Sequence, residues 1–154
     1  MKKVLLGMLF VGVASLANAQ KSEISEAKKA WNLLSITSGK TLADNLKALN
    51  DGLGHTDKAI AHEKSKDLPD AWSYRALFAS RIALVDSVDL NNAKANQKIA
   101  EEAITKAKAL DTKGGEKENI QTASVNVENA LRNRAIYAFN KKNFEGALEA
   151  FNEI

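Results

Sequence analysis

Apolar residues recur every three or four positions along nearly the whole of residues 22–154. That spacing places them on one side of an α-helix, whereas a half-buried strand would alternate at every second position. Alanine, lysine, leucine, asparagine and glutamate dominate the composition, and β-branched and aromatic residues are sparse. Both observations favour helix over sheet. We therefore expect an all-α fold with about six helices after the N-terminal segment.

Breaks in this pattern set the predicted boundaries of the first two helices. The first is expected from Ser22 to the break near Ser38-Gly39, and the second begins near Thr41. Its apolar positions stay in phase across Gly52 and Gly54. A glycine costs about 1 kcal/mol in a helix interior, but the unbroken phase predicts a single helix.

The four later helices are bounded by proline, by glycine pairs and by short polar turns. Proline suits the first turn of a helix, and glycine suits its C-terminal end. We expect the third helix from Pro69 to about Asp86. The fourth is expected after the polar connection of Ser87 to Asn92 and as far as the stop at Asp111-Thr112-Lys113-Gly114-Gly115. The fifth is expected from about Glu118 to Lys141, and the sixth from Phe144 onward.

The first nineteen residues have the three parts of a secretory signal peptide. These are the basic start Lys2-Lys3, the uncharged run from Val4 to Leu16, and the small-x-small cleavage site Ala17-Asn18-Ala19 before Gln20. The apolar run is too short to span a membrane, which takes about 20 residues. We expect residues 1–19 to be removed and residues 20–154 to form one exported domain, in the periplasm or at the cell surface, that does not span the membrane.

Charge and cysteine content exclude several classes of function. Loss of Lys2 and Lys3 lowers the formal net charge from +3 to +1, because twenty basic residues then face nineteen acidic ones. No block of basic residues stands out, so no nucleic-acid partner is expected. The sequence has no cysteine, which excludes disulfides, thiol catalysis and cysteine-bound zinc.

The sequence carries no motif typical of an enzyme. His55 and His62 are seven residues apart, roughly 10 Å along a helix, which is too far for both to bind one metal ion directly. Glu101-Glu102, Glu116 and Glu118 are interpreted as solvated carboxylates. Nucleophile-elbow, zinc-protease and phosphate-loop motifs are absent. We expect no catalytic activity, no cofactor and no metal site.

The last predicted helix pair reads AIYAFNKKNFEGALEAF over residues 135–151. Ala135 is a small residue on its first helix, Phe144 an aromatic residue that opens the second, Ala147 a small residue three positions later, and Phe151 an aromatic residue one turn on. This pattern resembles the core of a tetratricopeptide repeat. Small residues let adjacent helices approach closely, and the aromatic residues are expected to fill the space between hairpins. The resemblance implies antiparallel hairpins stacked as an α-solenoid.

An earlier pair resembles the same repeat more distantly. Trp72 and Ala76 match the first helix, and Ala103 and Ala107 match the second. The connection between these helices is longer than in the family, so the repeat is divergent, and the first pair agrees only in being a helical hairpin. Trp31 and Trp72 are expected to fill the core. The alternative is an unrelated helical bundle.

The resemblance also implies a binding surface. The first helix of each tetratricopeptide hairpin lines a concave groove that holds an extended peptide or a partner helix. Asparagine and arginine there suit peptide backbone or carboxylate groups. The residues expected to face the groove are Ser73, Leu77 and Ser80 on the third helix, and Arg132, Asn133, Ile136 and Asn140 on the fifth.

The function implied is a non-catalytic protein–protein interaction scaffold of the cell envelope. The alternative is a solute- or glycan-binding accessory protein for nutrient uptake, which would need clustered exposed aromatic residues. Phe151 and Ile154 lie on the apolar side of the last helix. Repeat arrays normally end in a helix with a polar outer face, so we expect the array to continue beyond Ile154.

Overall fold

The computed structural model describes residues 23–34 and 41–154. These residues form six helices and no strand, which confirms the predicted all-α class and number of helices. The expected signal peptide with Ala17, Ala19 and Gln20, and the expected end of the first helix at Ser38-Gly39, lie outside the described residues. The helices are residues 23–34, α2 (Leu42–Ile60), α3 (Pro69–Val85), α4 (Leu90–Leu110), α5 (Lys117–Asn140) and α6 (Phe144–Asn152).

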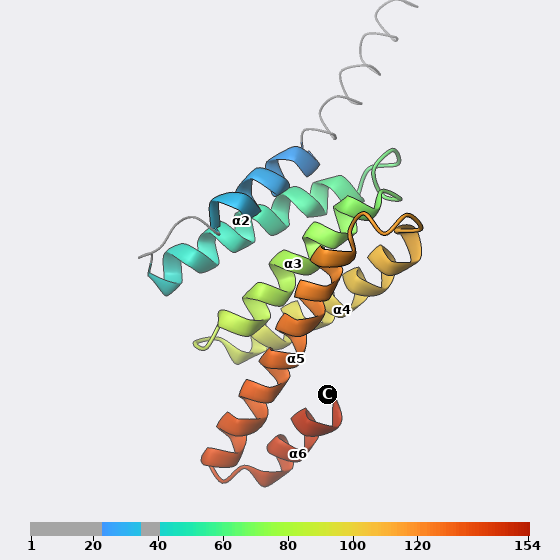
Figure 1. Cartoon of the computed structure of the whole chain (residues 1–154). Coiled ribbons are helices and arrows are strands. Elements are labelled where there is room, and N and C mark those ends of the chain that lie inside the picture. Colours follow the sequence, from blue (N-terminus) through green and yellow to red (C-terminus); the bar gives the residue numbers. More distant parts are fainter. Residues whose placement is uncertain (1–22, 35–40) are drawn as a thin grey trace, which may run out of the picture.

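The helices pack beside their neighbours in sequence, with α3 in a central position (Figure 1). α3 contacts α2, α4 and α5, and α5 contacts α3, α4 and α6. α2 and α6 do not touch and lie at opposite ends of the molecule (Figure 1). The first half of α5 lies against α3, whereas its second half projects with α6 beyond the other helices (Figure 1). Each contact between labelled helices thus joins elements one or two apart along the chain.

Side-chain caps explain where three of the helices begin. Thr41 accepts a hydrogen bond from the N–H of Asp44 before α2, and Asn143 accepts one from the N–H of Gly146 before α6. Asp89 accepts from two backbone N–H groups of the first turn of α4. A capping oxygen satisfies N–H groups that have no partner within the helix. The expected connection of 87–92 is therefore too long, because capping by Asp89 starts α4 at Leu90.

Small residues form the buried contacts between the helices, as the sequence predicted. Close approach of two helices requires small side chains at the crossing. The alanines expected to pack between helices are all buried, namely Ala76, Ala103, Ala107, Ala135 and Ala147. Trp72 is half-buried and packs against the main hydrophobic core, which contains Ala76, Ala103 and Ala107. Its indole Nε1 donates a hydrogen bond to the carbonyl of Lys66 at 2.5 Å.

The expected packing of Phe144 and Phe151 is wrong. Their side chains are 60% and 50% exposed. α6 buries Ala147 and Ala150, and among the labelled helices it contacts only α5. Ala147 lies three positions after Phe144 and four before Phe151, so the phenyl groups border the buried side of α6, but no labelled helix other than α5 contacts α6 to cover them. They therefore fill no space between hairpins within residues 23–34 and 41–154.

Gly52 lies where α2 crosses α3. A Cβ atom at this position would lie closer than 3.0 Å to three atoms of the Phe78 ring, which is fully buried. The same ring meets the edge of Trp31, with ring centroids 5.4 Å apart. Phe78 therefore joins α3 to α2 and to the residue 23–34 helix. α2 stays continuous through both Gly52 and Gly54, as predicted.

The substitution Gly52→Ala is expected to lower the free energy of unfolding by about 1–2 kcal/mol, because overpacking the core outweighs a gain of about 1 kcal/mol in helix propensity. The matched control is Gly54→Ala, where an added Cβ meets nothing within 4 Å. That control is expected to stabilise the protein by about 0.5–1 kcal/mol. Urea denaturation followed by circular dichroism measures both. Equal effects of the two substitutions would contradict the packing role of Gly52.

Asp86 organises the connection between α3 and α4. Its buried carboxylate accepts hydrogen bonds from the backbone N–H groups of Val88 and Asp89, at 3.2 and 3.0 Å, and from the side-chain amide of Asn92, at 2.8 Å. Burial acts to raise the pKa of Asp86, but these hydrogen bonds together outweigh it and hold the pKa below its usual value. The ionised form therefore stabilises the folded chain.

The substitution Asp86→Asn removes this charge at nearly constant shape. The pKa of Asp86 is lower in the folded chain than in the unfolded chain, so its ionised carboxylate stabilises the fold at pH values above the unfolded-state pKa. This contribution to the free energy of unfolding is lost as the pH falls through the folded-state pKa. The variant is expected to be less stable than the parent by about 1–2 kcal/mol near neutral pH. That difference is expected to shrink as pH falls below about 4. Urea denaturation over a pH series tests this, and a difference independent of pH would count against it.

Candidate functional site

A pocket of about 330 Å³ opens between the residue 23–34 helix, α2, α3 and α5. We call it the groove pocket. The residue 23–34 helix, α3 and α5 supply six of its eight lining residues, and α2 supplies the other two. The lining residues are Trp31, Leu34, Asn45, Leu49, Arg81, Val85, Thr122 and Asn126.

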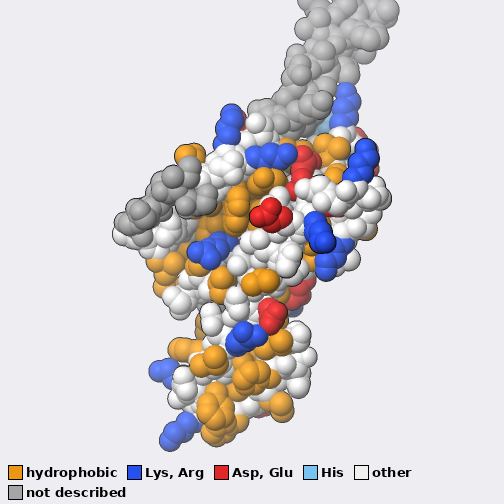
Figure 2. All heavy atoms as spheres, viewed as in Figure 1, with side chains coloured by type: hydrophobic (Ala, Val, Ile, Leu, Met, Phe, Trp, Pro, Cys, Tyr) orange, Lys and Arg blue, Asp and Glu red, His pale blue; other side chains and the backbone are white. Residues whose placement is uncertain are grey.

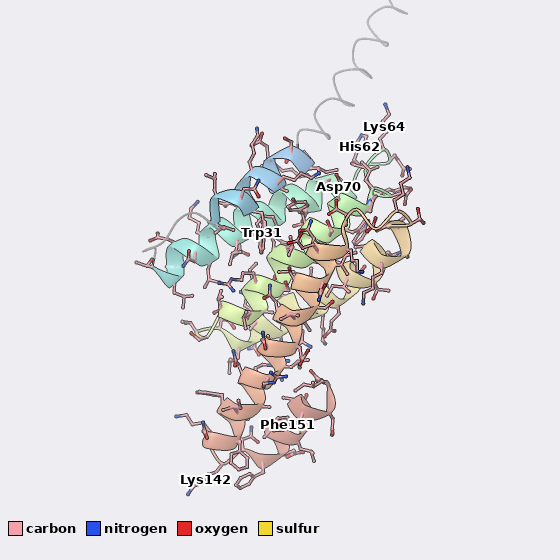
Figure 3. The ribbon with its side chains drawn as sticks, in the orientation of Figure 1. Trp31, His62, Lys64, Asp70, Lys142 and Phe151 are labelled. Atoms are coloured by element: carbon pink, nitrogen blue, oxygen red, sulfur yellow. The ribbon has the colours of Figure 1, made fainter. Side chains whose placement is uncertain are left out.

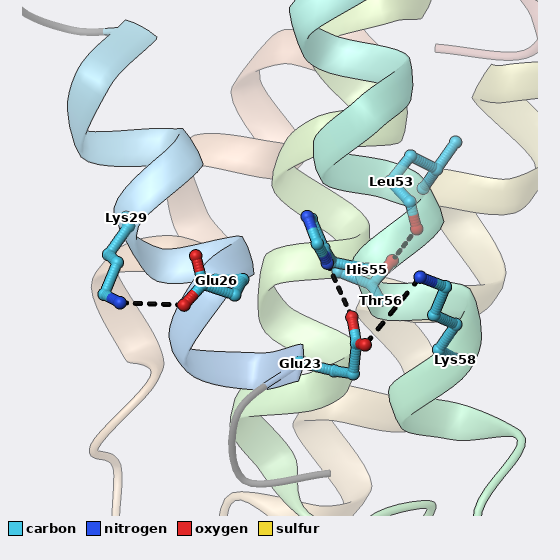
Figure 4. A network of polar contacts seen from close by, with 7 residues as sticks. All are labelled: Glu23, Glu26, Lys29, Leu53, His55, Thr56 and Lys58. Carbon is cyan, nitrogen blue, oxygen red and sulfur yellow. Dashed lines mark hydrogen bonds and ion pairs between the residues drawn. The ribbon is translucent and has the colours of Figure 1, made fainter. Parts of the chain in front are cut away.

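Polar contacts hold the residue 23–34 helix, one wall of the groove pocket, against its neighbours. Glu23 reaches across to α2, where its carboxylate lies 2.5 Å from Nδ1 of His55 and 3.7 Å from Nζ of Lys58 (Figure 4). Lys28 forms an ion pair with Asp70 of α3 at 3.0 Å. Partly exposed pairs of this kind contribute roughly 0.2–1 kcal/mol each. Their main effect is to fix the position of this helix.

Trp31 forms the apolar wall of the groove pocket. It is half-buried and packs against the main core, as the sequence predicted, and it also lines the pocket. Figure 3 shows it between the residue 23–34 helix and α3. Because its ring meets Phe78 edge-on, the indole is held in place by the core and leaves part of its surface to the pocket.

The opposite wall is polar. Arg81 is exposed and forms no hydrogen bond or ion pair with any described residue. Asn126 is buried, and its side-chain amide donates to the hydroxyl of Ser80 at 3.3 Å. Thr122 lies one turn before Asn126 on α5. Among the described residues, the groove pocket thus combines a cation that has no ion-pair partner with amide and hydroxyl groups, next to an apolar surface.

The expected groove residues of α3 are wrong. Ser73, Leu77 and Ser80 are fully buried, and the side of α3 that faces the groove pocket carries Arg81 and Val85 instead. Arg81 follows Ser80 directly, and one residue corresponds to about 100° around a helix. The prediction therefore chose a face of α3 about a third of a turn away from the groove.

Local hydrogen bonds allow these serines to be buried. The Ser80 hydroxyl donates to the carbonyl of Leu77 at 3.0 Å, so it needs no solvent. The Ser73 hydroxyl lies within hydrogen-bond distance of the Asp70 carbonyl and of the Glu116 carboxylate. The interpretation of Glu116 as a solvated carboxylate is therefore wrong. It is half-buried and joins α3 to the start of α5.

The expected groove residues of α5 are exposed but do not line the groove pocket. Arg132 is paired with Glu128 at 2.6 Å, one turn away on the same helix. Asn133 lines a different pocket, while Ile136 and Asn140 lie on the projecting half of α5. The structure thus places these four residues on the surface but outside the groove pocket, contrary to the expectation from the sequence. Thr122 and Asn126 are the residues of α5 that this expectation missed.

The second pocket, of about 430 Å³, lies between the α3–α4 connection and the α5–α6 hairpin. Its charged residues are of both signs: Asp86, Lys94, Arg134, Lys141, Glu149 and Glu153. The largely buried Arg134 donates to the side-chain oxygen of Gln97 and lies 3.4 Å from the carboxylate of Glu153. Because these charges largely compensate one another, this pocket shows no preference for a charged ligand.

Residues 23–34 and 41–154 contain neither a metal-binding cluster nor a membrane-spanning helix. Within these ranges, no three acidic, histidine or cysteine side chains lie close enough together to hold a metal ion. Likewise, none of the described helices has the length and apolar character needed to cross a membrane. The groove pocket is therefore the candidate site that the geometry favours.

Comparisons of the chain with protein-family models, with curated proteins and with solved structures gave no match.

Proposed function

We propose that the chain is an exported, non-catalytic interaction scaffold built from tetratricopeptide-like hairpins, and that it binds an extended segment of a partner protein in the groove pocket. The observation that carries this proposal is the pairing of an apolar wall at Trp31 with the unpaired Arg81 across the first helices of successive hairpins. The contacts between helices one or two apart in sequence support a stacked arrangement.

The lining residues suit a peptide segment. The side-chain amides of Asn45 and Asn126 are of the type that pairs with peptide main chain. The guanidinium of Arg81 suits a carboxylate, which it can bind through two parallel hydrogen bonds. Ligand pockets usually measure about 300–1,000 Å³. The groove pocket, at about 330 Å³, accommodates one or two side chains of a longer segment.

The lining residues also favour binding over catalysis. None of the eight is a histidine, aspartate, glutamate, lysine or cysteine, so the lining residues include no ordinary general base that could activate the hydroxyl of Thr122. The second candidate function, a solute- or glycan-binding accessory, would require an aromatic platform. Trp31 is the single aromatic residue among those that line the groove pocket, and part of its ring packs against the core and is not available to a ligand.

The test compares two peptide libraries. Each peptide of the first contains an acidic residue, and the second library carries the corresponding amide residue, asparagine or glutamine, at the same position. The substitution Arg81→Gln is expected to weaken binding of selected acidic peptides by about 10- to 100-fold, because a hydrogen bond to a charged group contributes about 1.5–3 kcal/mol. Fluorescence anisotropy measures the affinity. The matched control is Arg132→Gln, which changes an arginine outside the groove pocket and is expected to leave the affinity unchanged.

Three outcomes would contradict the proposal. Loss of binding in Arg132→Gln together with normal binding in Arg81→Gln would move the site to the face of α5 predicted from sequence. Equal affinity for the acidic and amide peptides would remove the role of Arg81. Binding of oligosaccharides but of no peptide would favour the accessory function.

A further inference from the structure

A second surface lies at the end of the molecule farthest from α2. Figure 2 shows hydrophobic side chains gathered at this end, and Figure 3 places Phe151 there. Each of its large apolar residues is about half exposed or more. We call this surface the α5–α6 apolar face, formed by Ile136 and Phe139 of α5 and by Phe144, Leu148 and Phe151 of α6.

These residues form one continuous patch. Phe144, Leu148 and Phe151 are spaced by four and three positions, so they share one side of α6. The rings of Phe139 and Phe144 meet edge-on across the turn, with centroids 5.6 Å apart, and join this stripe to α5. Ile136 precedes Phe139 by three positions and extends the patch along α5. Contiguous exposed patches of this kind mark interaction surfaces.

An acidic edge runs beside the apolar stripe of α6. Glu145, Glu149 and Glu153 are spaced by four positions and are exposed, so they line the neighbouring side of the helix. Glu153 lies 3.4 Å from Arg134. Glu145 and Glu149 form no ion pair with any residue that the structure describes. The face is thus apolar in the middle and carries along one edge two glutamates that have no ion-pair partner among the described residues, of which Glu149 also lines the second pocket.

This charge pattern decides between two classes of occupant. If two copies of α6 packed antiparallel about a two-fold axis, their acidic edges would lie on the same side of the interface. The like charges would then repel one another. A partner helix with lysine or arginine along the matching edge would instead pair with Glu145 and Glu149. Charge complementarity therefore favours a different, basic partner over a second copy packed antiparallel.

We propose that the α5–α6 apolar face docks an amphipathic helix of a partner protein. Apolar residues of that helix, recurring every three or four positions, pack on Phe144, Leu148 and Phe151, and its basic residues face Glu145 and Glu149. This mode of recognition places the apolar side of one helix against an apolar surface of another protein. It does not rest on the function of the groove pocket, which lies nearer α2 and uses other residues.

Two synthetic helical peptides test the proposal. Both carry leucine at every third or fourth position, and one has lysines along the edge where the other has glutamates. The lysine peptide is expected to bind the purified chain at least about tenfold more tightly, a difference of about 1.4 kcal/mol. The double substitution Glu145→Lys, Glu149→Lys is expected to reverse this preference. Fluorescence anisotropy at low and high salt measures the affinity.

Substitution of the apolar stripe gives a second readout. The double substitution Phe144→Ser, Leu148→Ser is expected to weaken binding of the lysine peptide by about tenfold or more. Both residues are exposed, so circular dichroism is expected to show an unchanged fold. The substitution Arg81→Gln serves as the matched control and is expected to leave this affinity unchanged. Failure at this face and failure at the groove pocket are therefore distinguishable.

Several outcomes would overturn the proposal. Equal affinity for the two peptides would show that Glu145 and Glu149 do not determine which peptide binds. Unchanged binding after Phe144→Ser, Leu148→Ser would place the peptide elsewhere. A dimer seen by analytical ultracentrifugation that depends on Phe144 and Leu148, without binding of the lysine peptide, would assign the face to a second copy of this chain.

Discussion

The contact of Phe78 with Gly52 and Trp31 positions the elements on which the candidate site depends. α2 approaches α3 closely because Gly52 has no side chain at the crossing, and the phenyl ring occupies the space left. The same ring fixes the indole of Trp31, and Trp31 is the apolar wall of the groove pocket. Core packing and site geometry are thus set by one side chain. Because protein interiors are close-packed, an added methyl group at this crossing has no free volume to occupy.

The elements that depend on local sequence could be predicted. Pro69 begins α3 as expected, and α4 ends at Leu110, directly before the predicted stop of 111–115, because backbone restrictions act over a few residues. The phase of the apolar positions across Gly52 and Gly54 indicated one helix, and the structure shows one. The alanines at the helix crossings were also predicted, since small size is itself the property that close packing selects.

The elements that depend on neighbours could not be predicted from one sequence. The resemblance to a tetratricopeptide repeat directed the groove prediction to the side of α3 that carries Ser73 and Ser80. A serine hydroxyl can bond to a carbonyl of the preceding turn, as Ser80 does with Leu77, and it is then buried at little cost. The opposite error occurred at Phe144 and Phe151. An aromatic residue is buried only if another element covers it, and α6 contacts α5 alone among the labelled helices.

α5 connects the two surfaces physically. Its first half carries Thr122 and Asn126 into the groove pocket, and its second half carries Ile136 and Phe139 into the α5–α6 apolar face. Asn126 and Phe139 are thirteen residues apart, and a helix rises 1.5 Å per residue, so roughly 20 Å separates them along the axis. No single side chain of a partner spans that distance, whereas one partner protein can contact both surfaces. The spacing between them is set by an uninterrupted helix, which keeps the two surfaces in a fixed relation whichever of them is occupied first.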